Sequence, residues 1–198
     1  ETLMQKLDLA LTADPMAIAM DIDAAGLPFL RNRMPPAGSK TVAELREVAE
    51  HARKPFILKG IMTVRGAEKA VEAGASAIVV SNHGGRVLDQ CPATAEVLPA
   101  IADAVGDRVM VLVDGGIRTG LDVFKALALG ADGVLIGRPF VTMVYGGGEE
   151  GVAAYVHKLT DELSDTMAMC GAHSLKEIDQ AMIATETADA TGADTSEE

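Results

Sequence analysis

Tryptophan is absent from this sequence, aromatic residues make up only 3% of its 198 positions, and cysteine occurs twice. Because large aromatic side chains are scarce, alanine, glycine, methionine and the branched aliphatic residues must fill the interior. The two cysteines, Cys91 and Cys170, lie far apart, without a CxxC spacing or a cluster of histidines. This pattern argues against a zinc site and a disulfide framework, so we expect no metal site, and it is typical of the reducing cytosol.

Long apolar runs and an excess of positive charge are also missing. No stretch reaches the ~18 consecutive apolar residues of a membrane-spanning helix, and we expect no signal peptide. The 17 Lys and Arg residues are outnumbered by 29 Asp and Glu residues, which gives a net charge of −12. A field of this sign repels nucleic acids and anionic membrane surfaces. We therefore expect a soluble, cytoplasmic protein that binds neither nucleic acid nor membranes.

What the sequence does have is a repeated alternation of short apolar runs and amphipathic helical segments. With 48% hydrophobic residues, the chain is long enough for one domain with a substantial core. The runs lie at 17–20, 55–58, 77–80, 109–113 and 133–136. Helices are expected at 42–52, 67–73, 94–105 and 121–129, with a long helix over 151–168 and a shorter one near 175–183. Residues 184–198 are expected to form an acidic, disordered tail.

Runs that are apolar throughout predict strands buried on both faces, and helical connections predict parallel pairing. The fold class is therefore α/β with a parallel sheet, either open or closed. Polar residues follow the strands where each one ends: Asp21, Lys59, Ser81, His83, Asp114 and Arg138. In a barrel the carboxyl ends of the strands carry the chemistry, so these side chains are candidates for one site, although solvated loops are polar too.

Residues 114–120 (DGGIRTG) follow a strand and open a helix. Gly115 and Gly116 let the backbone approach an anion, the helix N-terminus directs N–H groups at it, and Arg118 can bind it bidentately. After the next strand, Gly137 and Arg138 repeat this combination of a glycine with an arginine. We expect a phosphate site here; the alternative is a pair of tight turns with solvated arginines.

Residues 81–86 (SNHGGR) place a potential base beside a potential carboxylate clamp. His83 is suited to proton abstraction near neutral pH, and Arg86 offers a planar fork that matches a carboxylate. Lys59 could stabilise negative charge on a cofactor, and Asp21 could orient an imidazole. The alternatives are a surface histidine, a lysine at the rim of the sheet and an ordinary turn at the strand end.

Together, the motifs SNHGGR, DGGIR and Gly137-Arg138 resemble the signature of the FMN-dependent 2-hydroxy-acid oxidising family, which includes glycolate oxidase, lactate oxidase and FMN-dependent L-lactate dehydrogenases. The resemblance covers residues 3–183. It implies a (β/α)₈ TIM barrel, of which residues 1–183 supply roughly strands 4 to 8 and the C-terminal helices. It also implies FMN as cofactor and oxidation of a small L-2-hydroxy acid, such as lactate or glycolate, to the 2-oxo acid.

The resemblance also implies roles for individual residues. His83 would be the proton acceptor, Asp21 would support its imidazolium, and Arg86 would bind the substrate carboxylate. The flavin contacts would come from Lys59, Ser81 and Asp114, and the phosphate contacts from Gly115, Gly116, Arg118, Gly137 and Arg138.

Two positions depart from the family pattern. Ala19 stands where the family usually has a flavin-contacting threonine. Pro28 stands near the expected second carboxylate-binding arginine, and Arg31 fits that role only in a shifted alignment. These departures leave the identity of the hydroxy acid open.

The chain opens at Glu1 inside a helical pattern, and the resemblance leaves barrel strands one to three unaccounted for. We expect truncation or processing, and a partner that is either the missing N-terminal barrel segment or a second copy in a homo-oligomer. Two alternatives stay open. One is another FMN- or phosphate-binding barrel, such as a type 2 isopentenyl-diphosphate isomerase or an IMP dehydrogenase. The other is an inactive barrel fragment that self-associates.

Overall fold

The computed structural model describes residues 2–24, 27, 30, 34 and 38–184. The proposed boundary at residue 184 and the tail after it therefore stay predictions, because residues 185–198 lie outside the described part, as do Pro28 and Arg31. The elements follow in the order α1 (Thr2–Leu11), β1 (Ile18–Asp21), α2 (Val42–Ala52), β2 (Phe56–Ile61), α3 (Val64–Glu72), β3 (Ala77–Val80), α4 (Thr94–Val105), β4 (Met110–Val113), α5 (Gly120–Ala128), β5 (Gly133–Val134), α6 (Arg138–Cys170) and the 3₁₀ turns η3 (Leu175–Glu177) and η4 (Gln180–Met182).

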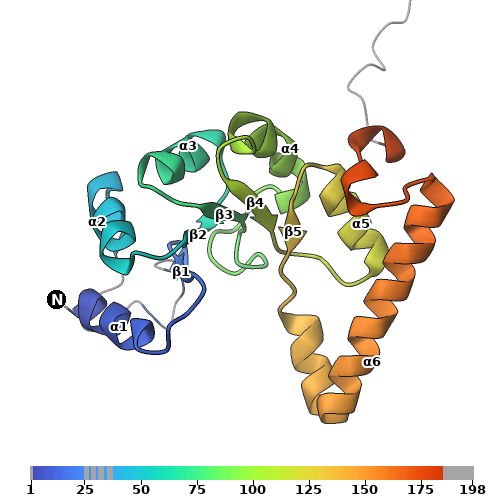
Figure 1. Cartoon of the computed structure of the whole chain (residues 1–198), viewed down its shortest axis with the longest axis horizontal. Coiled ribbons are helices and arrows are strands. Elements are labelled where there is room, and N and C mark those ends of the chain that lie inside the picture. The colour runs from blue at the N-terminus through green and yellow to red at the C-terminus, as the bar shows by residue number, and fades with distance from the viewer. Residues whose placement is uncertain (1, 25–26, 28–29, 31–33, 35–37, 185–198) are drawn as a thin grey trace, which may run out of the picture.

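The predicted parallel sheet is confirmed. In the described part of the chain, five strands pair in parallel in the order β1-β2-β3-β4-β5. Every step along the chain therefore moves one strand in the same direction. Since crossovers between parallel strands are right-handed, such an order places the connecting helices on one face of the sheet. Figure 1 shows this arrangement, with α2 to α5 in an arc around one side of the strands. It is the arrangement of a barrel segment, and a doubly wound sheet would instead reverse direction.

Local sequence signals explain where the helices begin. Thr41 and Glu44 form a capping box at the start of α2, and Thr119 and Asp122 form a second one at the start of α5. Thr63 caps α3 by accepting a hydrogen bond from the backbone N–H of Gly66. Each cap fixes the point at which a loop from the carboxyl end of a strand turns into a helix.

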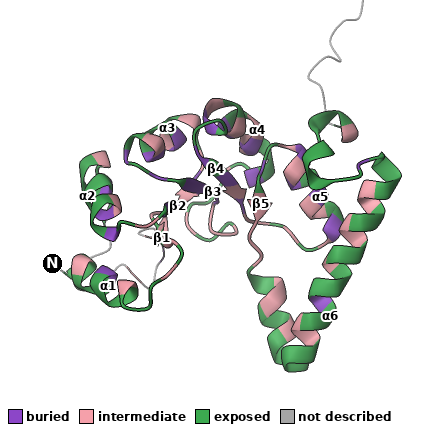
Figure 2. Ribbon diagram, in the orientation of Figure 1, coloured by how far each residue is buried: buried purple, intermediate pink, exposed green. Residues whose placement is uncertain are grey.

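The main core lies between the sheet and the helices α2 to α4, and the buried positions in Figure 2 follow that layer. The expectation that every strand is buried on both faces is correct only for β3, whose four residues are all buried. Residues of β1 and β4 alternate instead, and Ala19 and Met110 are exposed. The reason is that helices cover one face only, so side chains that point to the other face reach solvent.

The segment after β5 differs most from the sequence prediction. The long helix begins at Arg138 rather than near residue 151, and β5 ends at Val134 rather than residue 136. Gly148 breaks α6 with non-helical dihedral angles (φ 56°, ψ −138°), and Figure 1 shows α6 running away from the sheet and back as a hairpin. The helix predicted near 175–183 is wrong: this stretch forms the two short turns η3 and η4.

None of the helices in the described residues combines the length and apolar character that crossing a bilayer requires.

Candidate active site

Charged side chains from three strands meet at the carboxyl end of the sheet, around Lys59 on β2. The Lys59 Nζ atom lies 3.1 Å from Asp21 Oδ2 at the end of β1 and 3.5 Å from Asp114 Oδ2 after β4. All three side chains are at least partly buried, so their mutual attraction is screened less than on an open surface. The sequence predicted that these residues share a site, and the structure brings them together.

The backbone of β2 bulges at this point. The register with β3 shifts between Lys59 and Ile61, and Gly60 between them has φ of 106°. A Cβ atom on Gly60 would lie 2.8 Å from the Cβ atom of Asp23. Only glycine therefore combines this dihedral angle with this close approach. The bulge leaves room for Asp23 beside the strand end.

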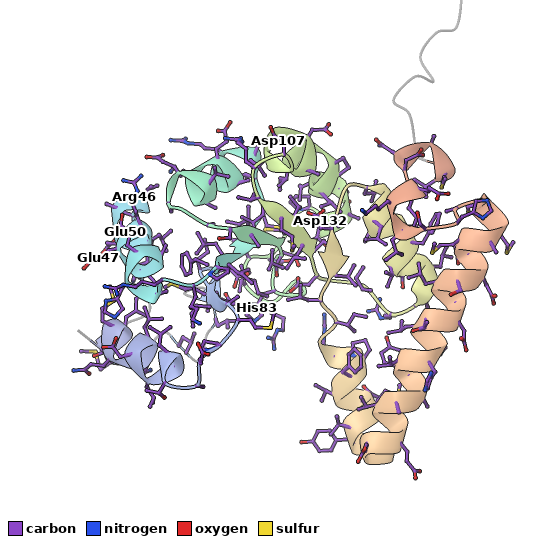
Figure 3. The ribbon with its side chains drawn as sticks, viewed as in Figure 1. Arg46, Glu47, Glu50, His83, Asp107 and Asp132 are labelled. Carbon is purple, nitrogen blue, oxygen red and sulfur yellow. The ribbon has the colours of Figure 1, made fainter. Side chains whose placement is uncertain are left out.

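His83 lies in the loop after β3, and Figure 3 places it beside the sheet on the side away from α3 and α4. Its backbone has a positive φ of 57°, which is uncommon for a non-glycine residue, and its N–H donates to the Ser81 hydroxyl at 3.1 Å. The Nδ1 atom is 2.8 Å from Asp23 Oδ1 and 3.4 Å from Asp21 Oδ2. Asp23 is thus a site residue that the sequence analysis missed.

The two carboxyl groups beside His83 differ in their acidity. Burial raises the pKa of Asp23, and the neighbouring carboxyl of Asp21 raises it further; this outweighs the hydrogen bond with His83. Burial also raises the pKa of Asp21, but hydrogen bonding with Asp23 and Lys59 more than compensates. The positive charges of Lys59 and His83 add to this, and the pKa of Asp21 lies below its ordinary value. The two neighbouring carboxyl groups therefore have pKa values that are shifted in opposite directions.

The loop that carries His83 is held in shape by its own residues. The Asn82 side-chain oxygen accepts a hydrogen bond from the Gly85 N–H at 3.0 Å, and its amide donates to the Pro92 carbonyl at 3.3 Å. Arg86 folds back and donates through Nε to the His83 carbonyl at 3.3 Å. Ser81 is fully buried, and its hydroxyl hydrogen-bonds within the loop.

The glycine loop after β4 and the turn after β5, which the sequence predicts to bind an anion, lie beside each other and are called the cradle below. Gly115 and Gly116 have φ values of 92° and 84°. A Cβ atom on Gly116 or Gly137 would meet nothing within 4 Å, so the space above both residues is open. Arg118 and Arg138 flank this space, and the N-termini of α5 and α6 face the same region. Backbone N–H groups, helix dipoles and two guanidinium groups together suit a dianionic phosphate.

Several residues that the sequence analysis did not single out support this cradle. Asp122 Oδ2 accepts hydrogen bonds from the backbone N–H groups of Arg118 and Thr119 at 3.0 and 2.9 Å. Tyr155 of α6 donates its hydroxyl to the Arg118 carbonyl at 2.8 Å, and Thr94 donates to the Asp114 carbonyl at 2.7 Å. Asp122 is recognisable in the sequence because it occupies the N3 position of a capping box, whereas Tyr155 is 37 residues away from its partner and has no local signal.

One cavity of about 820 Å³ connects the two halves of the site. It is bordered by Lys59, His83 and Arg86 at one end and by the glycine loops with both arginines at the other. Asp114 borders this cavity, and its buried Oδ1 atom has no hydrogen-bond partner among the residues that the structure describes. A buried acceptor without a partner is costly and is typical of a site that binds a ligand with hydroxyl groups. A phosphorylated cofactor with a hydroxylated chain fits these donors and acceptors.

The same cluster also has the geometry of a cation site. Asp21, Asp23 and His83 each bring one ligand atom, and these atoms lie within 4.8 Å of one another. In this chain the Lys59 ammonium group already lies against Asp21 and supplies positive charge there. The expectation that no metal is bound stays a prediction.

The comparisons with known proteins agree with this geometry. The chain is 47% identical over 147 residues to a peroxisomal (S)-2-hydroxyacid oxidase of Arabidopsis thaliana, and the match covers 74% of this chain and 40% of the relative. It is 49% identical over 130 residues to the glycolate oxidase of Spinacia oleracea, covering 66% of this chain and 35% of that protein. An L-lactate dehydrogenase of a Caulobacter strain is 45% identical over 141 residues, 71% of this chain and 37% of the relative.

The solved structures show the same relationship. A lactate oxidase of Pediococcus acidilactici superposes with a TM-score of 0.82 at 35% identity, covering 89% of this chain and 55% of that chain. A mandelate oxidase with (S)-mandelic acid superposes with a TM-score of 0.80 at 36% identity. The chain thus spans less than half the length of the curated relatives and about half of the solved ones. The five-stranded sheet is part of a TIM barrel. Since the model of the FMN-dependent dehydrogenase family matches residues 12–185, the chain belongs to that family.

Proposed function

We propose that this chain carries the FMN phosphate cradle and the acid–base half of an active site that oxidises a small L-2-hydroxy acid to the 2-oxo acid. The observation that carries the proposal is that one cavity is bordered both by Lys59 and His83 and by the two glycine loops. The names of the relatives support it, because they describe 2-hydroxyacid, glycolate and lactate oxidation. A type 2 isopentenyl-diphosphate isomerase or an IMP dehydrogenase would share the cradle but has no need for the His83–Arg86 pair.

The phosphate group of FMN would bind over Gly116 and Gly137, between Arg118 and Arg138. Asp114, whose Oδ1 atom lacks a partner, would accept a hydrogen bond from the ribityl chain. Lys59 and Ser81 would contact the isoalloxazine ring. When bound, FMN supplies a two-electron acceptor.

His83 would take the proton that leaves the substrate. Its Nδ1 atom is engaged by Asp23 and Asp21, so Nε2 is the nitrogen left to act as the base. The two carboxylates stabilise the imidazolium that forms, and Arg86 at the border of the same cavity would hold the substrate carboxylate. Lys59 would stabilise negative charge that develops on the ring system beside it.

The test has two stages. FMN is first titrated into this chain combined with an N-terminal barrel segment, because the chain carries only half of the proposed site. Binding is followed by flavin absorbance and fluorescence. The loaded protein is then mixed without oxygen with lactate, glycolate and mandelate, and loss of flavin absorbance is recorded. We expect binding, and bleaching by at least one acid. A protein that stays colourless would support the inactive-fragment alternative instead.

A matched pair of variants isolates the base. His83→Gln should slow bleaching by about 10²–10⁴-fold without loss of FMN, which is the usual contribution of a general base. His157→Gln, on the exposed surface of α6, should have no effect. Bleaching by the His83 variant within about tenfold of the parent would overturn the assignment.

Two further properties belong to this proposal. The described sheet leaves β1 and β5 with a neighbour on one side only, which supports a partner that is either an N-terminal barrel segment or a second copy of the chain. The predicted cytoplasmic location stays a prediction, and the Arabidopsis relative is named as peroxisomal.

A further inference from the structure

We propose that Asp23 is the positioning residue for His83: it accepts the Nδ1–H hydrogen bond and fixes the tautomer that leaves Nε2 free as a base. The inference rests on the proposed function of His83 and deepens it. The family resemblance assigned support of the imidazole to Asp21 alone, and the structure adds a second carboxylate.

The distances separate the two carboxylates. Asp23 Oδ1 is 2.8 Å from Nδ1, which is a normal hydrogen-bond length, whereas Asp21 Oδ2 is 3.4 Å away. Asp21 Oδ2 also accepts from Lys59 at 3.1 Å, so this oxygen is shared. The side chain of Asp23 is 11% exposed and that of Asp21 is 32% exposed. Asp23 therefore makes the shorter and better shielded contact, and Asp21 links the imidazole to Lys59.

Backbone contacts of β1 and β2 hold Asp23 next to His83. The N–H group of Ile22 donates to the Lys59 carbonyl at 2.9 Å, which extends the pairing of β1 with β2 beyond the strand end. Asp23 then packs against Gly60, where a Cβ atom would lie 3.0 Å from the Asp23 backbone nitrogen. The bulge of β2 and the glycine within it thus give Asp23 its space, and a larger residue there would push it away from His83.

The arrangement has a chemical consequence for the base. A neutral imidazole carries one proton, and a strong acceptor at Nδ1 keeps the proton on that nitrogen. Nε2 then has a free lone pair. The second carboxylate oxygen of Asp23, Oδ2, is buried and has no hydrogen-bond partner among the described residues, so an acceptor remains unsatisfied next to the imidazole. Protonation of His83 places a positive charge beside this carboxylate, and the pair becomes more stable.

The direct test measures which nitrogen of the His83 imidazole carries the proton. Nitrogen-15 NMR of the histidine rings, recorded above the pH at which they are charged, distinguishes Nδ1–H from Nε2–H. The chain has four histidines, and His83→Gln identifies the signal of His83. We expect Nδ1–H in the parent protein and in Asp23→Asn, whose amide oxygen still accepts. Asp23→Ala should shift the ring toward the other tautomer or a mixture, while Asp21→Asn should leave it on Nδ1.

The opposite pattern would overturn the proposal: an unchanged tautomer in Asp23→Ala, or a change in Asp21→Asn only. Asp23→Ser, with a shorter side chain, repeats the measurement if the alanine variant does not fold. Because the signal requires neither FMN nor substrate, failure of this inference is distinguishable from failure of the proposed function, which the flavin titration reports.

A kinetic measurement on FMN-loaded protein adds a second readout. Asp23→Ala should lower the rate of flavin reduction by at least about tenfold, within the range that a general base contributes, without changing the apparent affinity for the hydroxy acid. Asp23→Asn should recover part of the rate. The pH profile of the variants is compared with the parent, since Asp21, Lys59, Asp114 and Arg138 also surround the loop of His83. An equal loss of the flavin reduction rate in Asp23→Ala and Asp23→Asn would show that the hydrogen bond to Nδ1 does not determine the rate.

Discussion

Arg138 at the start of α6 donates a hydrogen bond through Nη2 to the carbonyl oxygen of Gly84, 54 residues earlier, at 3.2 Å. This contact ties the loop that carries His83 to the turn after β5. The guanidinium group of Arg138, which is expected to bind the phosphate, thus also contacts the loop of the expected base. A change at Gly84 should therefore alter anion binding in the cradle.

Gly84→Ala tests this link. A Cβ atom on Gly84 would lie 2.5 Å from Arg138 Nη2, and φ of 66° is unfavourable for alanine. We expect the unfavourable φ angle to lower the free energy of unfolding by about 1–2 kcal/mol. We also expect the new methyl group to displace Arg138 and so to weaken FMN binding. Gly85→Ala is the matched control, because φ is 78° there and its Cβ would meet nothing within 4 Å. Thermal unfolding should show similar losses in both variants, and FMN titration should separate them. Equal FMN affinity would contradict the link.

Gly60→Ala tests the space that Asp23 occupies. The new Cβ would lie 2.8 Å from the Cβ of Asp23 in a backbone that disfavours alanine, so we expect a loss of at least about 2 kcal/mol and a disturbed His83 ring signal. Gly74→Ala has a similar φ of 86° but only an ordinary contact of 3.9 Å with Ala49. Urea unfolding and nitrogen-15 NMR provide the comparison. A His83 signal that is unchanged in the Gly60 variant would show that Asp23 does not depend on the bulge.

Asp122→Ala should destabilise the cradle in a pH-dependent way. Burial raises the pKa of Asp122. Hydrogen bonds from the Thr119 hydroxyl and from the backbone N–H groups of Arg118 and Thr119 lower it by more than burial raises it, so the pKa lies below its ordinary value of 3.8. An acid with a lowered pKa stabilises the fold above its unfolded-state pKa, and this stabilisation is lost as pH falls through the folded-state pKa. We expect about 1–2 kcal/mol of destabilisation near pH 7 and a smaller difference below about pH 4.

Denaturant unfolding at several pH values measures this difference, with exposed Asp103→Ala on α4 as the control. A difference between parent and Asp122→Ala that stays constant from neutral to acidic pH would show that the charge of Asp122 contributes nothing to the cap.

Gly120→Ala tests the contact between α5 and α6. Alanine usually stabilises a helix relative to glycine. Here the new Cβ would lie 2.5 Å from the Leu159 carbonyl oxygen and would also clash with the backbone nitrogen of Leu163. We therefore expect a net loss of about 2 kcal/mol or more, because the backbone of α6 must move. Gly147→Ala, with nothing within 4 Å, should be neutral within about 0.5 kcal/mol. A neutral Gly120 variant in a thermal unfolding experiment would show that the two helices separate easily.

The sequence predicted the parallel sheet and the polar strand ends because both depend on short-range patterns: apolar runs, amphipathic helical segments and glycine turns. Asp23 was not predicted because its partner His83 lies 60 residues further along the chain and because Asp23 itself lies two residues beyond the end of β1. Extended backbone places residues two apart on the same face, so the Asp-Ile-Asp spacing was an available signal.

The region after β5 was predicted least well for a different reason. Pro139 and three successive glycines at 146–148 argue against a helix by propensity, yet proline is tolerated in the first turn and the glycines lie at the break of the hairpin. Packing against α5 stabilises the helix where propensity does not. For the segment 175–183 the opposite error occurred: a helix was predicted where none forms. Its apolar residues are spaced as in a helix, but two short turns place Ile178 and Met182 in a small cluster with Phe124 of α5.

An apolar groove of about 310 Å³ lies beside β5, between α5 and α6, and it is bordered by Val134, Phe140 and Val156. β5 has a strand neighbour on one side only in the described sheet, and Tyr145 at the end of the α6 hairpin is 89% exposed. Free strand edges and exposed apolar patches favour association, so we expect the chain alone to self-associate.

Sedimentation velocity on protein verified by mass should show a dimer or larger species that dissociates on dilution. Val156→Glu places a charge in the groove and should shift this equilibrium toward monomer by about tenfold or more, since burying an unpaired charge costs several kcal/mol. Met169→Glu adds the same charge to α6 at a position that is 88% exposed and outside the residues bordering the groove, so it should leave the equilibrium unchanged. Both residues are at least partly exposed, so neither change removes core packing. A parent chain that stays monomeric at all concentrations, or equal effects of the two variants, would refute the groove as the contact surface.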